Sequence, residues 1–176
     1  AGLALSSTLN ACNSPLRGLM VIGISCVVMA VLLAVAELRA RHTRDVSQMR
    51  LRDALIVGVA QIGALIPGVS RSGSTLTAAL FLNFKREEAA RFSFLLGLPA
   101  IALAGLKELW VLLRADLPAH AWPHLIFGLV VASVSAFFAI WGLMKFLERF
   151  STWPFVIYRA LLGVFLIVAV STGLLT

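Results

Sequence analysis

Long apolar runs with few or no charged residues constrain this sequence more than any other feature. The first of them, from Gly18 to Ala36, has no Asp, Glu, Lys or Arg at 19 consecutive positions. A helix of about 20 residues crosses a bilayer core of about 30 Å. Three later runs are also long enough to cross. We therefore predict membrane-spanning helices at 18–37, 92–113, 122–144 and 154–175.

The overall composition agrees with a membrane protein. The 176 residues are 60% hydrophobic and only 13% charged, which leaves too few polar side chains to cover a soluble fold. Since lipid cannot satisfy backbone N–H and C=O groups, we expect a single all-α membrane domain over residues 1–176. The net charge of +7 comes from basic residues grouped between apolar runs, which is typical of topology signals and not of a nucleic-acid site. No nucleic-acid partner is expected.

The charged segments predict which ends of the helices face the cytoplasm. Residues 38–53 carry five arginines and are predicted to form a cytoplasmic loop. The basic segments 83–91 and 145–150 are expected on the same side, as loops. The short, nearly neutral segment 114–120 is expected on the opposite side.

Residues 54–84 do not fit a simple crossing. Two apolar stretches, 54–66 and 75–84, are each too short to span, at about 20 Å and about 15 Å of helix. Pro67 and Gly68 end the first stretch. Both flanks are basic, so a single broken crossing would place one basic loop on the wrong side. We therefore predict a re-entrant helical hairpin over 54–84.

The connection between these stretches reads PGVSRSGST, residues 67–75. Non-helical backbone at membrane depth must be buried in protein or line a wet cavity. Glycines at 68 and 73 allow successive N–H groups to converge on an anion, and the following helix adds its positive N-terminal end. Arg71 supplies a planar fork of donors, which suits phosphate oxygens. The hydroxyls come from Ser70, Ser72, Ser74 and Thr75.

Two alternatives to a phosphate-processing site stay open on the residues alone. Arg71 could instead pair with an acidic residue and hold helices together, since small residues and buried ion pairs are common at helix contacts in membranes. The motif also suits a polyprenyl-phosphate or anion transporter or flippase without hydrolytic activity, because broken helices that point a dipole end at an anion form substrate sites in carriers. An enzyme would additionally need an acid or base beside the Ser-Arg-Ser sequence.

The stretch GVAQIGALIPGVSRSGSTLTAALFLNFKREEAARFSFLLGLPA resembles the second signature region of the undecaprenyl-diphosphate phosphatase family, the bacitracin-resistance membrane phosphatases of bacteria. FVIYRALLG, residues 155–163, resembles the end of those proteins. The resemblance implies hydrolysis of undecaprenyl diphosphate to undecaprenyl phosphate and inorganic phosphate, which recycles the cell-wall lipid carrier. It implies a multi-pass protein of the bacterial inner membrane whose partners are the polyprenyl diphosphate lipid and the bilayer. A homodimer is left open.

The family's first signature region, of the form E-G-x-T-E-F-L-P-x-S-S-x-G-H, has no counterpart in this sequence, and the chain begins within an apolar phrase at Ala1. We therefore expect the chain to be the later part of a longer protein and one half of an inverted repeat. The isolated chain should bind phosphate better than it cleaves it. The resemblance also implies a divalent cation, Mg²⁺ or Ca²⁺, held through the absent region, and we predict no metal-ligating residues in this chain.

Arg71 is the strongest catalytic candidate, as the group that stabilises charge in phosphoryl transfer. Ser70 and Ser72 are candidates for hydrogen bonding to phosphate, and one of them for nucleophile if a base lies beside it. We expect substrate-binding roles for Gly68, Gly73, Ser74, Thr75 and Gln61.

Several other polar residues are interpreted as structural. His42, His120 and His124 are expected to be solvated or capping rather than catalytic. Glu37 with Arg41, and Glu88 with Arg91, have spacings typical of surface pairs. Arg159 lies within the last apolar run, and two readings of it stay open: its depth permits a role in function, and its side chain is also long enough to extend to the inner interface.

Overall fold

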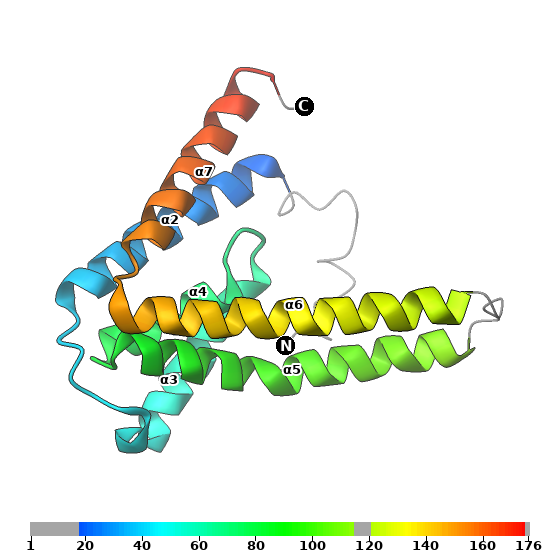
Figure 1. Cartoon of the computed structure of the whole chain (residues 1–176). Coiled ribbons are helices and arrows are strands. Elements are labelled where there is room, and N and C mark those ends of the chain that lie inside the picture. The colour runs from blue at the N-terminus through cyan, green and yellow to red at the C-terminus, as the bar shows by residue number, and fades with distance from the viewer. Residues whose placement is uncertain (1–17, 115–120, 175–176) are drawn as a thin grey trace.

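The computed structural model describes residues 18–114 and 121–174, and everything regular in them is helical. The described residues contain six α-helices and two 3₁₀ segments (Figure 1). Their bounds are α2 (Leu19–Arg39), η2 (Val46–Gln48), α3 (Leu51–Ile62), η3 (Gly63–Leu65), α4 (Arg71–Phe81), α5 (Arg86–Arg114), α6 (Ala121–Arg149) and α7 (Trp153–Ser171). The predicted all-α class is confirmed.

Four of these helices are long and apolar enough to cross a membrane, as the sequence predicted. They comprise α2, α5, α6 and α7, the span in α6 running from Trp122 to Arg149. At 1.5 Å per residue, even the 19-residue α7 reaches about 28 Å. The shorter α3 and α4, with 12 and 11 residues, form a pair of half-length helices. α3 begins at Leu51, three residues before the hairpin predicted at 54–84, so its first turn lies in the segment 38–53 that was expected as a loop.

The long helices form two pairs that diverge from each other (Figure 1). α2 lies beside α7, and α5 lies beside α6. The α2–α7 crossing is tight because glycines face each other: a Cβ added at Gly163 would lie 2.8 Å from the carbonyl oxygen of Gly23. Small residues that allow such close backbone approach are a common means of helix association in membranes.

Of the two short helices, α4 connects the pair to the rest of the fold, since it contacts α2 and α5 as well as α3. Val57, Ala79, Leu80 and Phe84 are fully buried in the core that these helices share. This packing fixes where α4 begins, and the start of α4 carries the Ser-Arg-Ser motif.

Two basic segments that were expected as loops belong largely to helices. Arg86 to Arg91 form the first turns of α5, and Lys145 to Arg149 form the last turns of α6. The physical reason is local: Glu87 and Glu88 complement the positive N-terminal end of α5, and Arg149 complements the C-terminal end of α6. The segment 115–120 lies outside the described residues.

Glu37 joins three parts of the fold and does not pair with Arg41. Its Oε1 accepts hydrogen bonds from Nε and Nη2 of Arg86 at 2.7 and 2.6 Å, and its Oε2 accepts one from the hydroxyl of Thr152 at 2.9 Å. The carboxylate side chain is only 3% exposed and Thr152 is fully buried. Because a buried carboxylate needs such partners, this contact ties the end of α2 to the start of α5 and to the turn before α7.

Glu88 likewise contacts the loop after α2 and not Arg91. Its Oε2 accepts a hydrogen bond from the backbone N–H of Val46 at 3.2 Å. Beside it, Lys85 forms a 2.8 Å ion pair with Asp45. The loop is therefore attached to the connection between α4 and α5.

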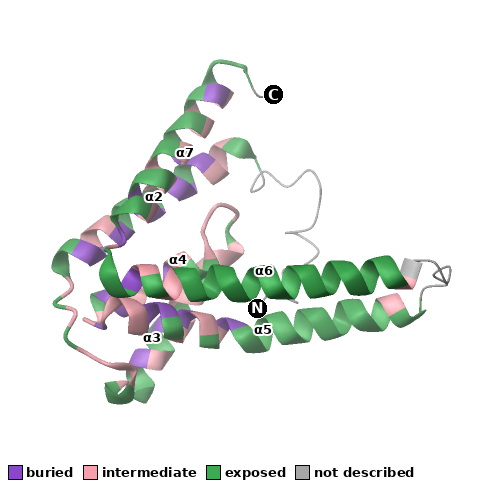
Figure 2. Ribbon diagram, viewed as in Figure 1, coloured by how far each residue is buried: buried purple, intermediate pink, exposed green. Residues whose placement is uncertain are grey.

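Much of the α5–α6 pair has an exposed apolar surface (Figure 2). In the α6 window that could cross a membrane, none of the residues is buried, whereas a third of the corresponding α2 window is buried. Exposed Leu, Ile, Val and Phe are stable against lipid, so this surface is consistent with a bilayer environment.

Candidate functional site

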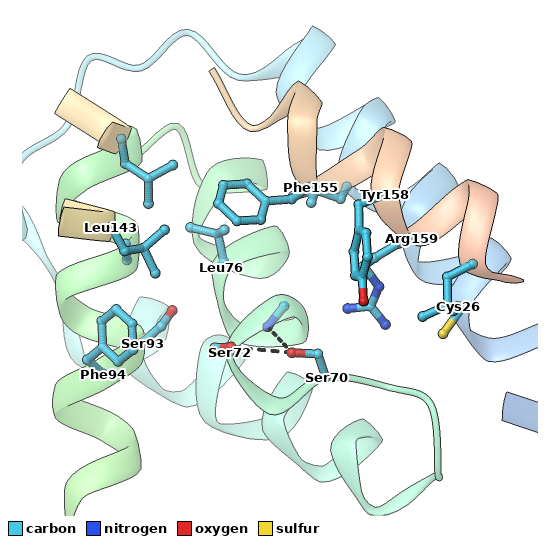
Figure 3. Close-up of a pocket in the computed structure, with 15 residues that line it drawn as sticks. Cys26, Ser70, Ser72, Leu76, Ser93, Phe94, Leu143, Phe155, Tyr158 and Arg159 are labelled. Carbon is cyan, nitrogen blue, oxygen red and sulfur yellow. Dashed lines mark hydrogen bonds between the residues drawn. The ribbon is translucent and has the colours of Figure 1, made fainter. Parts of the chain in front are cut away.

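A cavity of about 320 Å³ lies at the start of α4, where side chains from α2, α5, α6 and α7 converge (Figure 3). One part of its lining is polar and the larger part is apolar. The polar lining residues are Ser70, Ser72, Ser93, Tyr158 and Arg159, and the others are Cys26, Leu33, Gly73, Leu76, Ala90, Phe94, Leu143, Leu147, Phe155 and Leu162.

The serine hydroxyls at this cavity are arranged by the start of α4. Ser70 is the N-cap residue, and its Oγ accepts a hydrogen bond from the backbone N–H of Gly73 at 3.2 Å. Its hydroxyl is also 3.3 Å from that of Ser72 (Figure 3). N-cap serines satisfy donors that the first helical turn leaves free. The cap therefore holds both hydroxyls at the N-terminal end of the helix.

The turn before this helix requires a glycine. Gly68 has φ of +88°, which side-chain-bearing residues rarely adopt, and a Cβ there would lie 2.7 Å from the carbonyl oxygen of Ile22. The expectation that glycine gives tight turns and close backbone approach is met here, although the approach is to α2. Gly68 also presents its carbonyl oxygen to Arg159.

Arg159 reaches from α7 to the first turn of α4. Its Nη2 donates a 2.7 Å hydrogen bond to the carbonyl oxygen of Gly68, and its Nη1 lies 2.7 Å from the position of a Cβ added at Gly73. Its Nε is buried and has no hydrogen-bond partner among the described residues. A guanidinium therefore lies against the positive end of a helix, with donor capacity left over.

The charges at this cavity are unbalanced. The first turn of α4 contains no acidic residue, and no Asp or Glu is among the residues that line the cavity in the described part of the chain. The cation and the helix end both favour an anion in a space partly shielded from water. Chemically, the arrangement suits an anionic group with hydroxyl and N–H donors around it.

Arg71 lines a different cavity, of about 460 Å³, together with Gln61 and residues of α3, η3 and α5. A Cβ added at Gly97 would lie 3.6 Å from the Arg71 Nη2, so the guanidinium packs against the small residue of α5. Arg71 is exposed. The two arginines near the start of α4 thus line separate spaces.

The structure separates the predicted binding residues into groups. Ser70, Ser72 and Gly73 line the smaller cavity, whereas Gln61 and Arg71 line the larger one. Ser74 and Thr75 are buried, and both hydroxyls donate to the Arg71 carbonyl oxygen, at 2.9 and 3.0 Å. These two hydroxyls are therefore used within α4. The functional roles assigned to all of these residues stay predictions.

Sequence reasoning gave too little weight to Arg159 and did not select Tyr158 or Ser93. The available signal for Arg159 was a guanidinium inside an otherwise uncharged apolar run, the same signal that selected Arg71. Ser93 is buried and donates to the carbonyl oxygen of Ala89 at 2.7 Å, so its exposure to the cavity is partial. No sequence pattern marked Ser93 or Tyr158.

Histidines and carboxylates are not gathered at either cavity. Neither His42 nor His124 is among the lining residues, and His120 lies outside the described residues. Among the described residues, no group of three or more His, Cys, Asp or Glu could hold a metal ion. The donor set at the start of α4 therefore does not fit a protein-held Mg²⁺ or Ca²⁺ site.

Comparison with known proteins gives the family. Residues 1–165 match the family described as "Bacitracin resistance protein BacA". The chain is 73% identical over 173 residues to "Undecaprenyl-diphosphatase 2" of Mesorhizobium japonicum, covering 98% of this chain and 66% of that protein. It is 51% identical over 163 residues to "Undecaprenyl-diphosphatase" of Synechococcus elongatus, covering 93% of this chain and 57% of that protein.

A relative from Gloeobacter violaceus, also named "Undecaprenyl-diphosphatase", is 50% identical over 175 residues, covering 99% of this chain and 60% of the relative. The chain thus spans between 57% and 66% of the length of these relatives. With four candidate membrane spans in its described residues and a family match over most of its length, the chain belongs to the BacA bacitracin resistance family.

Proposed function

We propose that this chain acts in the hydrolysis of undecaprenyl diphosphate to undecaprenyl phosphate and inorganic phosphate. The names of its relatives support the proposal, and so does the lining of the cavity at the start of α4. That cavity has a cationic, hydroxyl-bearing part and a larger apolar part, as a lipid with a charged end group needs. The presence of a cationic part and an apolar part in one cavity is the observation on which the proposal rests.

The polar part would receive the diphosphate. Arg159 and the first turn of α4 offer positive charge without a carboxylate partner among the described residues, and the N–H at Nε of Arg159 is free to donate. Ser70 and Ser72 would add hydrogen bonds to phosphate oxygens. Charge-assisted hydrogen bonds of this kind are strong, and a guanidinium fits the geometry of phosphate.

In the reaction, water is added to the terminal phosphorus, and the bond from that phosphorus to the bridging oxygen breaks. The bridging oxygen leaves with undecaprenyl phosphate. Stabilising the negative charge is the main task in such a transfer, and we assign it to the arginines. We also keep the predicted catalytic role of Arg71, whose guanidinium would act on the phosphate from the side of the second cavity. Ser70 or Ser72 would act as nucleophile only with a base beside it.

The apolar part of the cavity would accommodate the first isoprene units. Its walls come from four helices and include Leu33, Leu76, Phe94, Leu143 and Phe155. Apolar walls around a small number of polar groups are typical of small-molecule sites. This lining favours a lipid phosphate over a water-soluble one.

The finer architecture belongs to the same proposal. We assign α3 and α4 to a re-entrant hairpin, with the basic segments around it facing the cytoplasm of a bacterial inner membrane. The described residues would supply the phosphate-binding half of an inverted repeat, and the first signature region would supply the acid or base. A divalent cation would arrive through that region or on the diphosphate itself, since the described residues offer no ligand set for it.

The test compares phosphate release by the 176-residue chain with release by a completed protein, in which a segment carrying the family's first signature region is joined upstream. We expect hydrolysis of undecaprenyl diphosphate only by the completed protein, and its loss in the Arg71→Ala variant, which should keep its normal elution volume and helical content. Near-normal turnover in that variant would remove Arg71 from the site.

The same preparation distinguishes a phosphatase from a flippase. A completed protein that moves fluorescent polyprenyl diphosphate across vesicle membranes without releasing phosphate would overturn the hydrolase proposal. Phosphate release that does not depend on vesicle sealing is the result that we expect.

A further inference from the structure

A third cavity, of about 570 Å³, lies where the loop after α2 meets the start of α3 and the end of α4. Its lining is rich in arginine and shares no residue with the two cavities near the Ser-Arg-Ser motif. The lining residues are Arg44, Gln48, Arg50, Arg52, Asp53, Ile56 and Leu82, and we call them the basic groove.

Asp53 and Arg44 neutralise each other in this groove. Asp53 Oδ2 accepts a 2.5 Å hydrogen bond from Arg44 Nη2 and a 3.0 Å one from the backbone N–H of Arg50. Arg44 is held further by the carbonyl oxygens of Leu82 and Gln48, at 3.1 and 3.0 Å. This pair is a fixed structural element, so Asp53 has little capacity left for other cations.

Arg50 and Arg52 are the two guanidinium groups of the groove that no ion pair holds among the described residues. Both residues are exposed. Asp53 is also the one acidic residue among the lining residues. Two guanidinium groups at the rim of a concave site favour a phosphate group, which they can bind through several charge-assisted hydrogen bonds.

An apolar stripe continues from the groove along α3. Leu55, Ile56, Val59 and Ile62 recur at helical spacing after Arg52, and they are exposed by 61%, 41%, 65% and 53%. α3 lies at the periphery of the fold, with α4 as its principal α-helical neighbour (Figure 1). A free anion would need only the arginines, whereas a lipid would use both the arginines and the stripe.

We propose that the basic groove binds an anionic phospholipid, with its phosphate at Arg50 and Arg52 and its acyl chains along the stripe on α3. The charge complementarity and the adjoining apolar surface together select this occupant. The site lies apart from the cavity at the start of α4, and the proposal does not depend on the hydrolase assignment.

The test is a lipid titration of the 176-residue chain in a neutral detergent, followed by native mass spectrometry, which counts bound lipids. We expect phosphatidylglycerol to bind more tightly than phosphatidylcholine, whose choline balances the phosphate. The Arg50→Gln/Arg52→Gln variant should bind phosphatidylglycerol roughly 25-fold more weakly, since each arginine near anionic lipid contributes about a fivefold effect. Circular dichroism and size-exclusion elution verify its fold.

Arg39→Gln/Arg41→Gln is the matched control, because it removes the same charge from exposed arginines outside the groove. We expect it to retain phosphatidylglycerol binding. A second variant, Leu55→Gln/Val59→Gln, keeps every charge and should also weaken binding of long-chain lipid.

Unchanged binding in the Arg50→Gln/Arg52→Gln variant would overturn the site, as would an equal loss in the Arg39→Gln/Arg41→Gln control. If millimolar inorganic phosphate displaces the lipid completely, or if the stripe variant binds normally, the site takes free anions and the lipid proposal fails.

Discussion

Two helix starts in this protein have an arginine beside them, and they are built in opposite ways. At the start of α3, the first turn contains Asp53, which binds Arg44 and the backbone N–H of Arg50. At the start of α4, the first turn has no acidic residue. There Arg159 donates to a single carbonyl oxygen, that of Gly68, among the described residues, and its Nε has no partner.

The difference shows how one carboxylate in the first turn of a helix changes what the helix end can bind. An acidic side chain in the first turn neutralises both the helix end and the neighbouring guanidinium, so the contact is complete within the protein. Without it, the same two positive groups favour an external anion, and the favourable energy is larger where water is partly excluded. At the start of α3, the Asp53–Arg44 pair is therefore structural, and only Arg50 and Arg52 stay available to an anion. At the start of α4, Arg159 and the helix end are themselves suited to a ligand.

Arg159→Ala should have the largest effect. In the completed enzyme described above, we expect phosphate release to fall about a thousandfold, because an arginine that stabilises phosphoryl-transfer charge contributes at least that much. Arg159→Lys should recover part of the rate, since it keeps the charge but not the planar fork. The measurement is kcat for phosphate release. Turnover within a factor of three of the parent would show that the Arg159 guanidinium has no role in catalysis.

Gly68→Ala should disturb the turn that precedes α4 and positions its first residues. With φ of +88° and a Cβ 2.7 Å from the Ile22 carbonyl oxygen, we expect a loss of about 2 to 3 kcal/mol in stability. Thermal unfolding in detergent measures it. Gly58→Ala is the matched control, because a Cβ there meets nothing within 4 Å, and it should be neutral or slightly stabilising. Equal unfolding temperatures for the two variants would contradict the strained turn.

Asp53→Asn should remove the ion pair between Asp53 and Arg44 at the start of α3. Arg44 is 27% exposed and would lose its carboxylate partner, so we expect a loss of about 2 kcal/mol. Chemical unfolding followed by circular dichroism provides the measurement. If the variant is as stable as the parent, Asp53 does not close the start of α3 in the way described.

Ser70→Ala and Ser72→Ala should separate capping from ligand contact. Ser70 accepts from Gly73 N–H, so its replacement should cost about 1 kcal/mol of stability. Ser72 is exposed and caps nothing, so its replacement should leave stability unchanged. Comparing unfolding midpoints and phosphate affinity of the two variants tests this. A destabilised Ser72→Ala together with a neutral Ser70→Ala would reverse the assignment.

The smallest expected effect is a dependence of stability on pH through Asp53. The hydrogen bond from Arg44, followed by that from the Arg50 N–H, lowers the pKa of this carboxyl below its ordinary value. A lowered folded-state pKa contributes stability above the unfolded value of about 3.9, and this contribution is lost as pH falls through the folded value. Asp53→Asn should therefore flatten the stability profile at acidic pH. A parallel profile in the variant would assign the pH dependence to other groups.

The sequence predicted the frame of this fold because its signals are local. Apolar length identified the four spans, and Pro67 with Gly68 located the break before α4. The bounds near charged residues were less accurate: Arg86 to Arg91 were expected as a loop and begin α5. Charged residues are also good helix formers, and composition alone does not separate a polar loop from the first turn of a helix.

The candidate site was only partly predictable. The Ser-Arg-Ser motif led to the start of α4, but not to the partner that reaches it from α7 or to the separation of Arg71 from the two serines. Helices that are apolar on most faces carry little information about which face meets which neighbour, since lipid and protein are equally acceptable to Leu or Val. Pairing across 91 positions, as between Arg159 and Gly68, therefore cannot be read from spacing.

Local signals in the sequence are enough to make this chain helical, suited to a membrane and broken at a turn rich in glycine and serine, because apolar length and backbone preference act within a few residues. Tertiary packing places Arg159 against the first turn of α4, joins Glu37 to Arg86 and Thr152, and brings Arg44 to Asp53 at the start of α3. These contacts depend on how the helices cross. The crossing is set by close packing, as at Gly23 and Gly163, which no local pattern specifies.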